Sequence, residues 1–523
     1  MRRILSAAAV LAAVAAMASP GAGSRRVVLI VWDGMRPDFI DAGNTPNLCS
    51  LIQRGVYFER HHPVYPSATD VNGTAIVTGA YPGHSTIVAN MDYRPAINAD
   101  KPVGIEQPAV VRKGDEVTGG RHLAVATLAE FLHSQRLRTA IAGAKDVSLL
   151  ADRAPRGEGG GSSPVLAAGT AMPAGTEAAL TAALGAFPPV GKNDEGKDNK
   201  LERDNWTTRG FLEVLWKDGI PAYSLLWMAE PDASQHPSSP GSPAAIKAIR
   251  NNDANLGCVL AELERRGLRD DTDVIIASDH GFSSISRAVD VAARLSAAGF
   301  HAVRRVDGGL KSGDVLVIPN GGSTVIYVGG RDPAVSARVA AWLQEQDWTG
   351  VIFSRAPFAG TFPLGVIHID SPDAPDFTVS FRWTPEANPF GAPGMVCIDG
   401  KDRGPGGGAH ASLSVSDMHN ILIAAGPDFR VGMHDSTASG NVDLTPTILW
   451  VLGFKDEALR RDGRVLGEAL TGEAPPLKSS ESKHLTARRE IAPGRVWEQY
   501  LDMAEVNGVQ YFDEGNGSVK SAR

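Results

Sequence analysis

Short, almost wholly apolar runs alternate along the chain with segments whose apolar residues recur at helical spacing. Such runs are typical of strands that are buried on both faces of a parallel sheet. The predicted strands are 25–32, 139–143, 222–228, 273–277 and 420–425. One predicted helix begins at Pro46 after Thr45 as its N-cap, and others span 123–137 and 244–266. This alternation predicts an α/β fold with a mostly parallel sheet covered by helices on both faces.

Three stretches depart from the alternation. Residues 155–200 are rich in Gly, Ala and Pro, and we interpret them as a loop or flexible insertion. Residues 283–393 contain short strands of their own and are interpreted as an inserted cap lobe. Residues 471–523 are polar and are assigned as a C-terminal tail. The catalytic domain is therefore expected to span residues 25–470.

The N-terminus has the pattern of a secretory signal peptide. Two arginines after Met1 precede an apolar run over residues 4–17 and the small-residue site Ala16-Met17-Ala18. We assign residues 1–24 to the signal peptide, which implies an exported protein, periplasmic or extracellular. An uncleaved anchor is the alternative. No later segment reaches ~18 continuous apolar residues, so no stable membrane anchor is expected after cleavage.

Composition narrows the class of protein. The 523 residues are 43% hydrophobic and 21% charged, which excludes global disorder. The net charge is −8 and no long basic run occurs, so a nucleic-acid-binding platform is not expected. Cys49, Cys258 and Cys397 match no zinc motif, and we interpret them as buried free thiols.

Acidic and imidazole side chains follow several of the predicted strands, where α/β sheets place their chemistry. They are Asp33, Asp232, His236, Asp279 and His280, and His410 joins them from a glycine-rich loop. Taken singly, each has an ordinary explanation as a helix cap or a solvated histidine. Together they are the oxygen and nitrogen ligands that suit Zn²⁺. Six ligands exceed one tetrahedral ion, and they suit two metals roughly 3.5–4 Å apart that share a substrate.

Four other histidines, His61, His62, His84 and His419, are interpreted as non-ligands. A nucleophile is also expected, and Thr69 lies where a loop enters a predicted helix. The helix N-terminus would favour both an alkoxide and a phosphate there, and metal ligation would lower the pKa of the hydroxyl. The alternative is that Thr69 only caps the helix.

Seven segments resemble the alkaline phosphatase superfamily, in its nucleotide pyrophosphatase/phosphodiesterase branch. In chain order they are VVLIVWDGMRPDF, TPNLCSLIQRGV, YPSATDVNGTAIVTGAYPGH, AEPDASQH, SDHGF, GGGAH and NVDLTPTILWVLG. The resemblance implies an αβα sandwich with a binuclear zinc site. Asp232, His236 and His410 would hold one Zn²⁺, and Asp33, Asp279, His280 and Thr69 the other. It also suggests Asn90 as a donor to a non-bridging phosphate oxygen, with a plain turn residue as the alternative.

The chain departs from this branch in two places. After Thr69 it has Asp70-Val71-Asn72-Gly73, without the aromatic residue that would stack on a nucleotide base. Lys145, in the sequence Gly-Ala-Lys-Asp, resembles a loop of phosphate monoesterases and phosphonoacetate hydrolases. A lysine there would favour a dianionic monoester, but Val147 replaces the second basic residue of that loop. Lys145 as a solvated lysine at the end of a strand remains the alternative.

The sequence therefore predicts an exported, binuclear-zinc phosphoric-ester hydrolase of phosphodiesterase/nucleotide pyrophosphatase type. Thr69 would attack phosphorus to form a covalent phospho-threonine, and water would hydrolyse it with net retention. The alternatives are a phosphate monoesterase or phosphonoacetate-type hydrolase, and a non-catalytic phosphate- or metal-binding protein. A sulfatase is disfavoured, because no Cys/Ser-x-Pro-x-Arg sequence lies near Thr69. The expected partner is a small phosphate-ester substrate, and the oligomeric state stays open.

Overall fold

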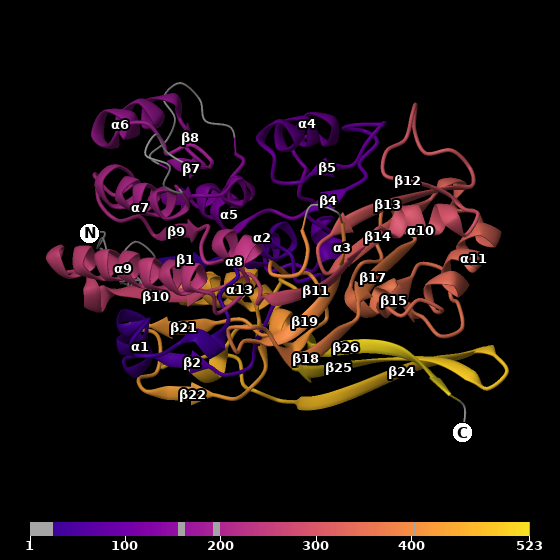
Figure 1. Cartoon of the computed structure of the whole chain (residues 1–523). Coiled ribbons are helices and arrows are strands. Elements are labelled where there is room, and N and C mark those ends of the chain that lie inside the picture. Colours follow the sequence, from indigo (N-terminus) through magenta and orange to yellow (C-terminus); the bar gives the residue numbers. More distant parts are fainter. Residues whose placement is uncertain (1–24, 155–162, 192–198, 401–402, 522–523) are drawn as a thin grey trace, which may run out of the picture.

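The computed structural model describes residues 25–154, 163–191, 199–400 and 403–521, and the predicted signal peptide lies outside them. A nine-stranded sheet forms the centre of the larger lobe (Figure 1). In spatial order its strands are β22 (Met433–Asp435), β2 (Val56–Phe58), β21 (Leu422–Ala425), β10 (Thr272–Ala277), β1 (Arg26–Trp32), β9 (Tyr223–Met228), β6 (Thr139–Gly143), β7 (Val165–Ala167) and β8 (Thr170–Met172). The run from β10 to β7 is parallel, whereas β21 and β8 pair antiparallel with their neighbours.

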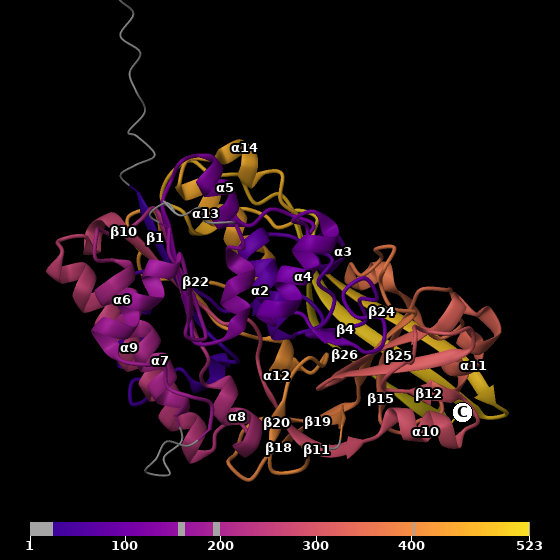
Figure 2. The same ribbon diagram turned by 90° about the horizontal axis from the view of Figure 1, so that it is seen from above.

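Helices cover both faces of this sheet, which confirms the predicted αβα sandwich (Figure 2). Helices α1 (Pro46–Gln53), α7 (Lys200–Gly210) and α9 (Pro243–Arg265) lie on one face. Helices α2 (Thr69–Thr78), α5 (Leu128–Ser134) and α13 (Leu444–Val451) lie on the other. Strand β1 shows why its sequence is a continuous apolar run: Val27, Leu29 and Val31 pack into one core, and the residues between them pack into the other.

Helix α1 begins where the sequence predicts, but its cap comes from elsewhere in the chain. The Thr45 hydroxyl accepts a hydrogen bond from the amide of Asp41 and caps no helical N–H. The carboxylate of Asp253, on α9, instead accepts from the amides of Asn47 and Leu48 at 3.1 and 2.9 Å. This contact satisfies two N–H groups of the first turn and fixes α1 against α9.

The segment expected to be a loop or flexible insertion contains regular structure. Within residues 155–200, strands β7 and β8 extend the central sheet and α6 (Ala174–Leu184) follows them. The expectation was wrong for these described parts because it weighed the Gly, Ala and Pro content as a whole. Alanine and leucine favour a helix, and seven of the eleven residues of AGTEAALTAAL are alanine or leucine, whereas its one glycine lies in the first turn.

A second lobe, containing residues 283–399, packs beside the larger one (Figure 1). Its six-stranded sheet consists of β12 (His301–Val303), β13 (Asp314–Asn320), β14 (Ser323–Val328), β17 (Phe377–Phe381), β15 (Thr349–Ser354) and β16 (Phe362–Pro363). Its four-stranded sheet consists of β18 (Trp383–Ala387), β19 (Pro393–Asp399), β11 (Ser283–Val289) and β20 (Gly408–Ala409). Helices α10 (Val291–Ala297) and α11 (Pro333–Leu343) complete the lobe. Strand β11 starts just after Asp279 and His280, so the lobe is attached at the candidate site.

The residues assigned to a C-terminal tail form a three-stranded antiparallel sheet, β24 (Ser480–Ala492), β25 (Arg495–Val506) and β26 (Val509–Ser521). Every second side chain of β25 is buried: Trp497, Gln499, Leu501 and Met503. The Gln499 side chain pairs with both backbone groups of Ile352 on β15, which joins the sheet to the second lobe. The polar character of this segment reflects its outward-facing residues.

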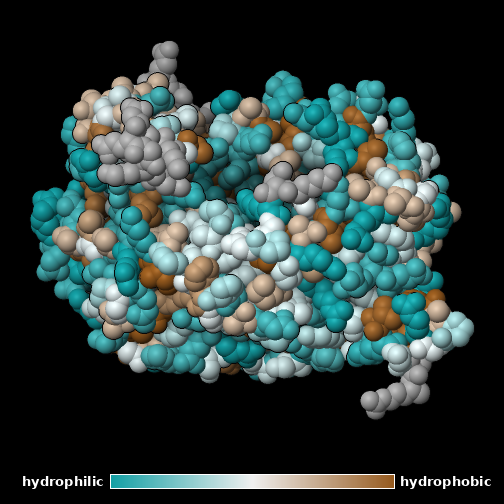
Figure 3. All heavy atoms as spheres, viewed as in Figure 1, coloured by the Kyte–Doolittle hydropathy of each residue, from teal (hydrophilic) through white to brown (hydrophobic). Residues whose placement is uncertain are grey.

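Within the described ranges, no helix has the length and apolar character needed to cross a membrane. On the face seen in Figure 3, hydrophobic side chains are scattered among hydrophilic ones, and the surface is hollowed between the side with α6 and the side with α4 (Pro108–Thr118). All three cysteines are free, as predicted. Their predicted burial was wrong, because Cys258 is exposed on the outward face of α9, and Cys49 and Cys397 are only partly buried.

Candidate active site

The parallel strands bring the predicted acidic and imidazole side chains to one edge of the sheet. Asp33 follows β1, Asp279 and His280 follow β10, and Asp232 and His236 lie on α8 (Asp232–Ser238) after β9. Because β10, β1 and β9 are adjacent and parallel, their carboxyl ends meet at the same place. His410 reaches this place from the residue after β20.

These side chains form two overlapping groups, each with ligand atoms within 4.8 Å of one another. In the first group, Asp232 Oδ1 lies 3.2 Å from His236 Nε2 and 3.6 Å from His410 Nε2. The second group joins Asp33, Asp232 and His280, with His280 Nε2 3.7 Å from Asp33 Oδ1. Asp279 Oδ2 lies 3.2 Å from the same imidazole nitrogen. The geometry thus assembles all six predicted residues and makes Asp232 common to both groups.

The three imidazoles share one hydrogen-bonding arrangement. Each places Nδ1 next to a backbone carbonyl: His236 at 3.0 Å from Gly408, His280 at 2.8 Å from Gly281, and His410 at 2.9 Å from Ser67. A carbonyl oxygen only accepts, so Nδ1 of His280 and of His410 carries the proton, and each neutral ring keeps its lone pair on Nε2. His236 differs, because the guanidinium of Arg403 also lies 2.5 Å from its Nδ1 and 3.2 Å from its Nε2. The Nε2 atoms of His280 and His410 therefore face the carboxylates as ligand atoms, as in metal sites whose histidines are oriented by backbone carbonyls.

Several buried carboxylate oxygens here have no hydrogen-bond donor. They are Asp33 Oδ1, Asp232 Oδ1 and Asp279 Oδ2. Burial raises the pKa of Asp33 well above its usual range and that of Asp279 to about 7. Burial also lowers the pKa of His410 well below its ordinary value. The protein alone thus leaves this cluster short of positive charge, and the donor set fits divalent cations.

Lys145 supplies the positive charge that the cluster does contain. It follows β6, which lies beside β9 in the sheet, and its Nζ lies 2.8 Å from Asp33 Oδ2 and 3.1 Å from Asp232 Oδ2. Burial alone would lower the pKa of Lys145, but the charges of Asp232 and Asp33 raise it well above its usual value. Lys145 is therefore a partly buried ion-pair partner of two buried carboxylates, and its description as a solvated lysine does not fit the structure.

Thr69 is the first residue of α2 and lies at the cluster. Its Oγ1 is 3.2 Å from His280 Nε2, and the residue is 3% exposed. Ala68 occupies the N-cap position, so Thr69 is not the cap. Asn90 accepts a hydrogen bond through Oδ1 from the amide of Asp70 at 2.8 Å, which holds its side chain beside the first turn of α2. The structure therefore brings both predicted residues to the start of this helix.

The sequence did not single out three residues that bear on the cluster. Trp227, on β9, donates from Nε1 to Asp33 Oδ2 at 2.9 Å. Asp70 and Glu106 are buried near Lys145, and each keeps one carboxylate oxygen without a hydrogen-bond partner. Burial, then the charge of Glu106, raises the pKa of Asp70 well above its usual range. Asp70 lies in the stretch that lacks the aromatic residue expected from the family resemblance. No sequence pattern indicates that Asp70 and Glu106 lie close together.

Comparisons with known proteins agree with these features. The chain is 25% identical over 269 residues to mouse ectonucleotide pyrophosphatase/phosphodiesterase family member 3, covering 51% of this chain and 26% of that protein. It is 26% identical over 261 residues to human family member 1, covering 49% and 23%. Venom phosphodiesterase CdcPDE of Crotalus durissus collilineatus is 24% identical over 262 residues, covering 50% and 26%. The chain thus matches about a quarter of the length of these curated relatives.

Among solved structures, murine ectonucleotide pyrophosphatase/phosphodiesterase 5 superposes with a TM-score of 0.56 at 18% identity, covering 82% of this chain and 95% of that one. An inactive variant of the same murine protein, in complex with AMP, superposes with a TM-score of 0.55. These likenesses support the fold. The family described as type I phosphodiesterase / nucleotide pyrophosphatase matches residues 27–351, and the chain therefore belongs to that family.

Proposed function

We propose that this protein hydrolyses phosphate esters with Thr69 as nucleophile and two Zn²⁺ ions as cofactors. The observation that carries the proposal is the position of Thr69 Oγ1, 3.2 Å from His280 Nε2 and on the first residue of α2. The hydroxyl lies at a helix N-terminus, where free N–H groups favour negative charge on the oxygen and on a bound phosphoryl group.

The ligand assignment follows the family resemblance and the two groups of side chains. Asp232, His236 and His410 would hold one ion. The second would be held by Asp33, Asp279, His280 and Thr69. When bound, the two ions neutralise phosphoryl charge and lower the pKa of the nucleophilic hydroxyl.

The chain's own residues position the reacting groups. Helix α2 is buried along its whole length, which fixes Thr69 relative to the sheet edge. Asn90 is anchored through Oδ1, so its Nδ2 group is free to donate to a non-bridging phosphate oxygen. Attack by Thr69 Oγ1 forms an O–P bond, breaks the bond to the leaving alcohol or phosphate, and gives a phospho-threonine. Water then displaces Thr69 from phosphorus, and two inversions give net retention.

A phosphodiester is the favoured substrate class. Lys145 is already paired with Asp33 and Asp232, so its charge is engaged inside the protein. For Lys145 to bind a dianionic monoester, its ion pairs with Asp33 and Asp232 would have to break. Monoester hydrolysis remains the second candidate because the same Nζ lies at the centre of the cluster. The AMP complex of the murine structural neighbour makes nucleotide esters a reasonable first panel.

The test measures kcat/KM for a bis-aryl phosphodiester and an aryl phosphate monoester with the zinc-loaded protein. We expect the diester to be preferred, and Thr69→Ala to abolish turnover of both while zinc content stays at two equivalents in this site. A phospho-threonine at position 69 should be trapped by rapid acid quench and found by mass spectrometry. A monoester preference that Lys145→Ala removes would overturn the diester assignment.

Two further results would replace the proposal altogether. Release of phosphate from phosphonoacetate, with neither ester turned over, would indicate a phosphonatase. Equal, negligible turnover by the unmodified protein and Thr69→Ala would indicate a phosphate- or metal-binding protein.

Export is part of the proposal, since the relatives include venom enzymes. Fractionation of producing cells, with N-terminal sequencing, should find the protein outside the cytoplasm and cleaved near residue 18.

A further inference from the structure

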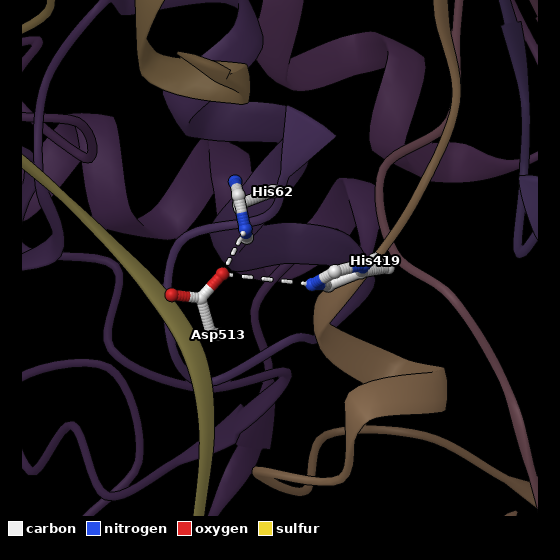
Figure 4. Close-up of side chains that lie close together, drawn as sticks. All are labelled: His62, His419 and Asp513. Carbon is white, nitrogen blue, oxygen red and sulfur yellow. Dashed lines mark hydrogen bonds and ion pairs between the residues drawn. The ribbon is translucent and has the colours of Figure 1, made fainter. Parts of the chain in front are cut away.

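Three side chains from distant parts of the chain converge outside the active site. They are His62 on β3 (His61–His62), His419 directly after α12 (Val415–Met418), and Asp513 on β26. Figure 4 shows both imidazoles pointing at the same carboxylate. None of the three belongs to the groups around Thr69. We infer that His62, His419 and Asp513 bind one further divalent cation, Zn²⁺, which fastens the C-terminal sheet to the larger lobe.

The spacing of the three ligand atoms fits a tetrahedral ion. Asp513 Oδ1 lies 3.0 Å from His62 Nε2 and 3.7 Å from His419 Nε2. In a tetrahedral zinc site with bonds of about 2.0–2.1 Å, neighbouring ligand atoms lie about 3.3 Å apart. The two observed distances lie on either side of that value, and all three ligand atoms lie within 4.8 Å of one another, which is close enough for them to share one ion.

The hydrogen atoms of His62 support the same conclusion. Its Nδ1 lies 3.0 Å from the carbonyl oxygen of Ser439, which only accepts, so Nδ1 carries the proton. A neutral His62 then directs the lone pair of Nε2 at a carboxylate oxygen. A proton on Nε2 would remove this conflict, but the imidazolium would be fully buried and beside a second imidazole, with ring centroids 4.9 Å apart. A shared metal ion satisfies both lone pairs without that cost.

Arg60 completes the surroundings of the carboxylate. Its guanidinium donates to both oxygens of Asp513, at 3.2 and 3.4 Å, and so fixes the plane of the group. Hydrogen-bonded carboxylates of this kind are common around metal ligands. The side chains of His419 and Asp513 are 29% and 23% exposed, which leaves a path for the ion and a position for a water as the fourth ligand.

Two imidazoles and one carboxylate select for zinc among the common cations. Ca²⁺ and Mg²⁺ require oxygen ligands in larger number, whereas Zn²⁺ accepts this mixture in four-coordinate sites. The role would be structural. In the sequence, His62 lies 357 residues before His419, and Asp513 lies 94 residues after it. The full binding free energy is therefore gained only when β26 has docked beside β3.

The experiment counts zinc. The purified full-length chain, His419→Ala and the control His434→Ala are each equilibrated with Zn²⁺, desalted, and measured by plasma mass spectrometry. His434 is a comparable surface histidine, paired with Glu59 rather than with a second imidazole. We expect His419→Ala to hold one equivalent less than the unmodified chain, and His434→Ala to hold the same amount.

A second variant and a second readout guard against a folding defect. Asp513→Asn keeps the size of the side chain and should also lack one equivalent. Zinc added to the metal-free chain should protect β26 from proteolysis, and the protection should be lost in both ligand variants. Equal zinc content in all four proteins would overturn the inference and leave a hydrogen-bonded cluster. Because the readout is a difference in metal content, it does not depend on whether Thr69 is the nucleophile.

Discussion

Replacing Lys145 by methionine tests how the active-site carboxylates are balanced. The side chain keeps its length but loses the ammonium group that contacts Asp33 at 2.8 Å and Asp232 at 3.1 Å. Both carboxylates are almost fully buried, with side chains 0% and 4% exposed. Removing one partner of a buried ion pair costs roughly 3–5 kcal/mol, because a charge is left without compensation.

The effect should depend on zinc. Unfolding entropy of roughly 2.1 cal/mol/K per residue makes 1 kcal/mol equivalent to about 1 °C for a chain of this length. The metal-free variant should therefore melt about 3–5 °C below the metal-free unmodified protein. With zinc bound, the ions neutralise the same carboxylates, so the difference should shrink. By linkage the variant must then bind zinc more tightly than the unmodified protein.

Calorimetric melting at pH 8, with and without zinc, measures both effects. A pH of 8 lies above the pKa of about 7 of Asp279 and favours the ionised carboxylates, which limits how much of the loss protonation hides. Lys247→Met, at an exposed lysine on α9, is the matched control and should change neither quantity. Equal melting temperatures of the two metal-free proteins, or weaker zinc binding by Lys145→Met, would refute the ion-pair account of Lys145.

Three further predictions concern other contacts. Asn90→Ala should lower kcat by roughly 10²–10³-fold, as loss of one oxyanion donor does. The control Asn98→Ala, in a nearby loop, should leave kcat unchanged. Similar steady-state rates for the two variants would show that Asn90 does not contact the substrate. Tyr511 donates to Asp443 Oδ2 at 2.8 Å. Burial raises the pKa of Asp443 to about 6, so the folded state loses stability as pH rises from about 4 through 6 and the carboxyl ionises. Because the Tyr511 bond favours the ionised form, Tyr511→Phe should cost more in urea unfolding at pH 8 than at pH 5, and the reverse order would contradict this. Asp253→Ala should destabilise the protein by about 1–2 kcal/mol through the lost cap of α1, and an unchanged denaturation midpoint would show that the cap is dispensable.

Five of the nine strands of the central sheet could be predicted, because each of them is a short, almost wholly apolar run. Strand β6 was predicted at its observed bounds, and β1, β9 and β10 within one residue at their N-terminal ends. Their residues are apolar on both faces, since helices cover both. The Asp and His residues beyond them followed from the same local signal. The sequence of strand β25 gave a weaker signal, because its buried residues mostly alternate with partly exposed ones and its average composition is polar.

What the sequence left open depends on contacts between distant segments. The two interpretations of Lys145 could not be separated until β6 was placed beside β9 and β9 beside β1. The cap of α1 comes from Asp253, about two hundred positions away, so Thr45 was the natural but incorrect choice. His62 and His419 were interpreted as non-ligands because a single histidine is more often solvated than metal-bound. Their approach to Asp513 depends on the C-terminal sheet, which was not expected. No local sequence pattern indicates which distant segments come into contact.

Charge balance connects Lys145 to the choice of substrate. Asp33, Asp232 and Asp279 carry three negative charges when metal is bound, and Lys145 returns one. Two divalent ions would therefore leave the site with two net positive charges, and ionising Thr69 would reduce this to one. That charge matches the monoanionic phosphoryl group of a diester, whereas a monoester dianion would leave an excess of negative charge in a buried site. If two zinc ions bind as proposed, the metal ligands would account for the binding of phosphate esters, and Lys145, by remaining paired with the carboxylates, would set which ester charge is preferred.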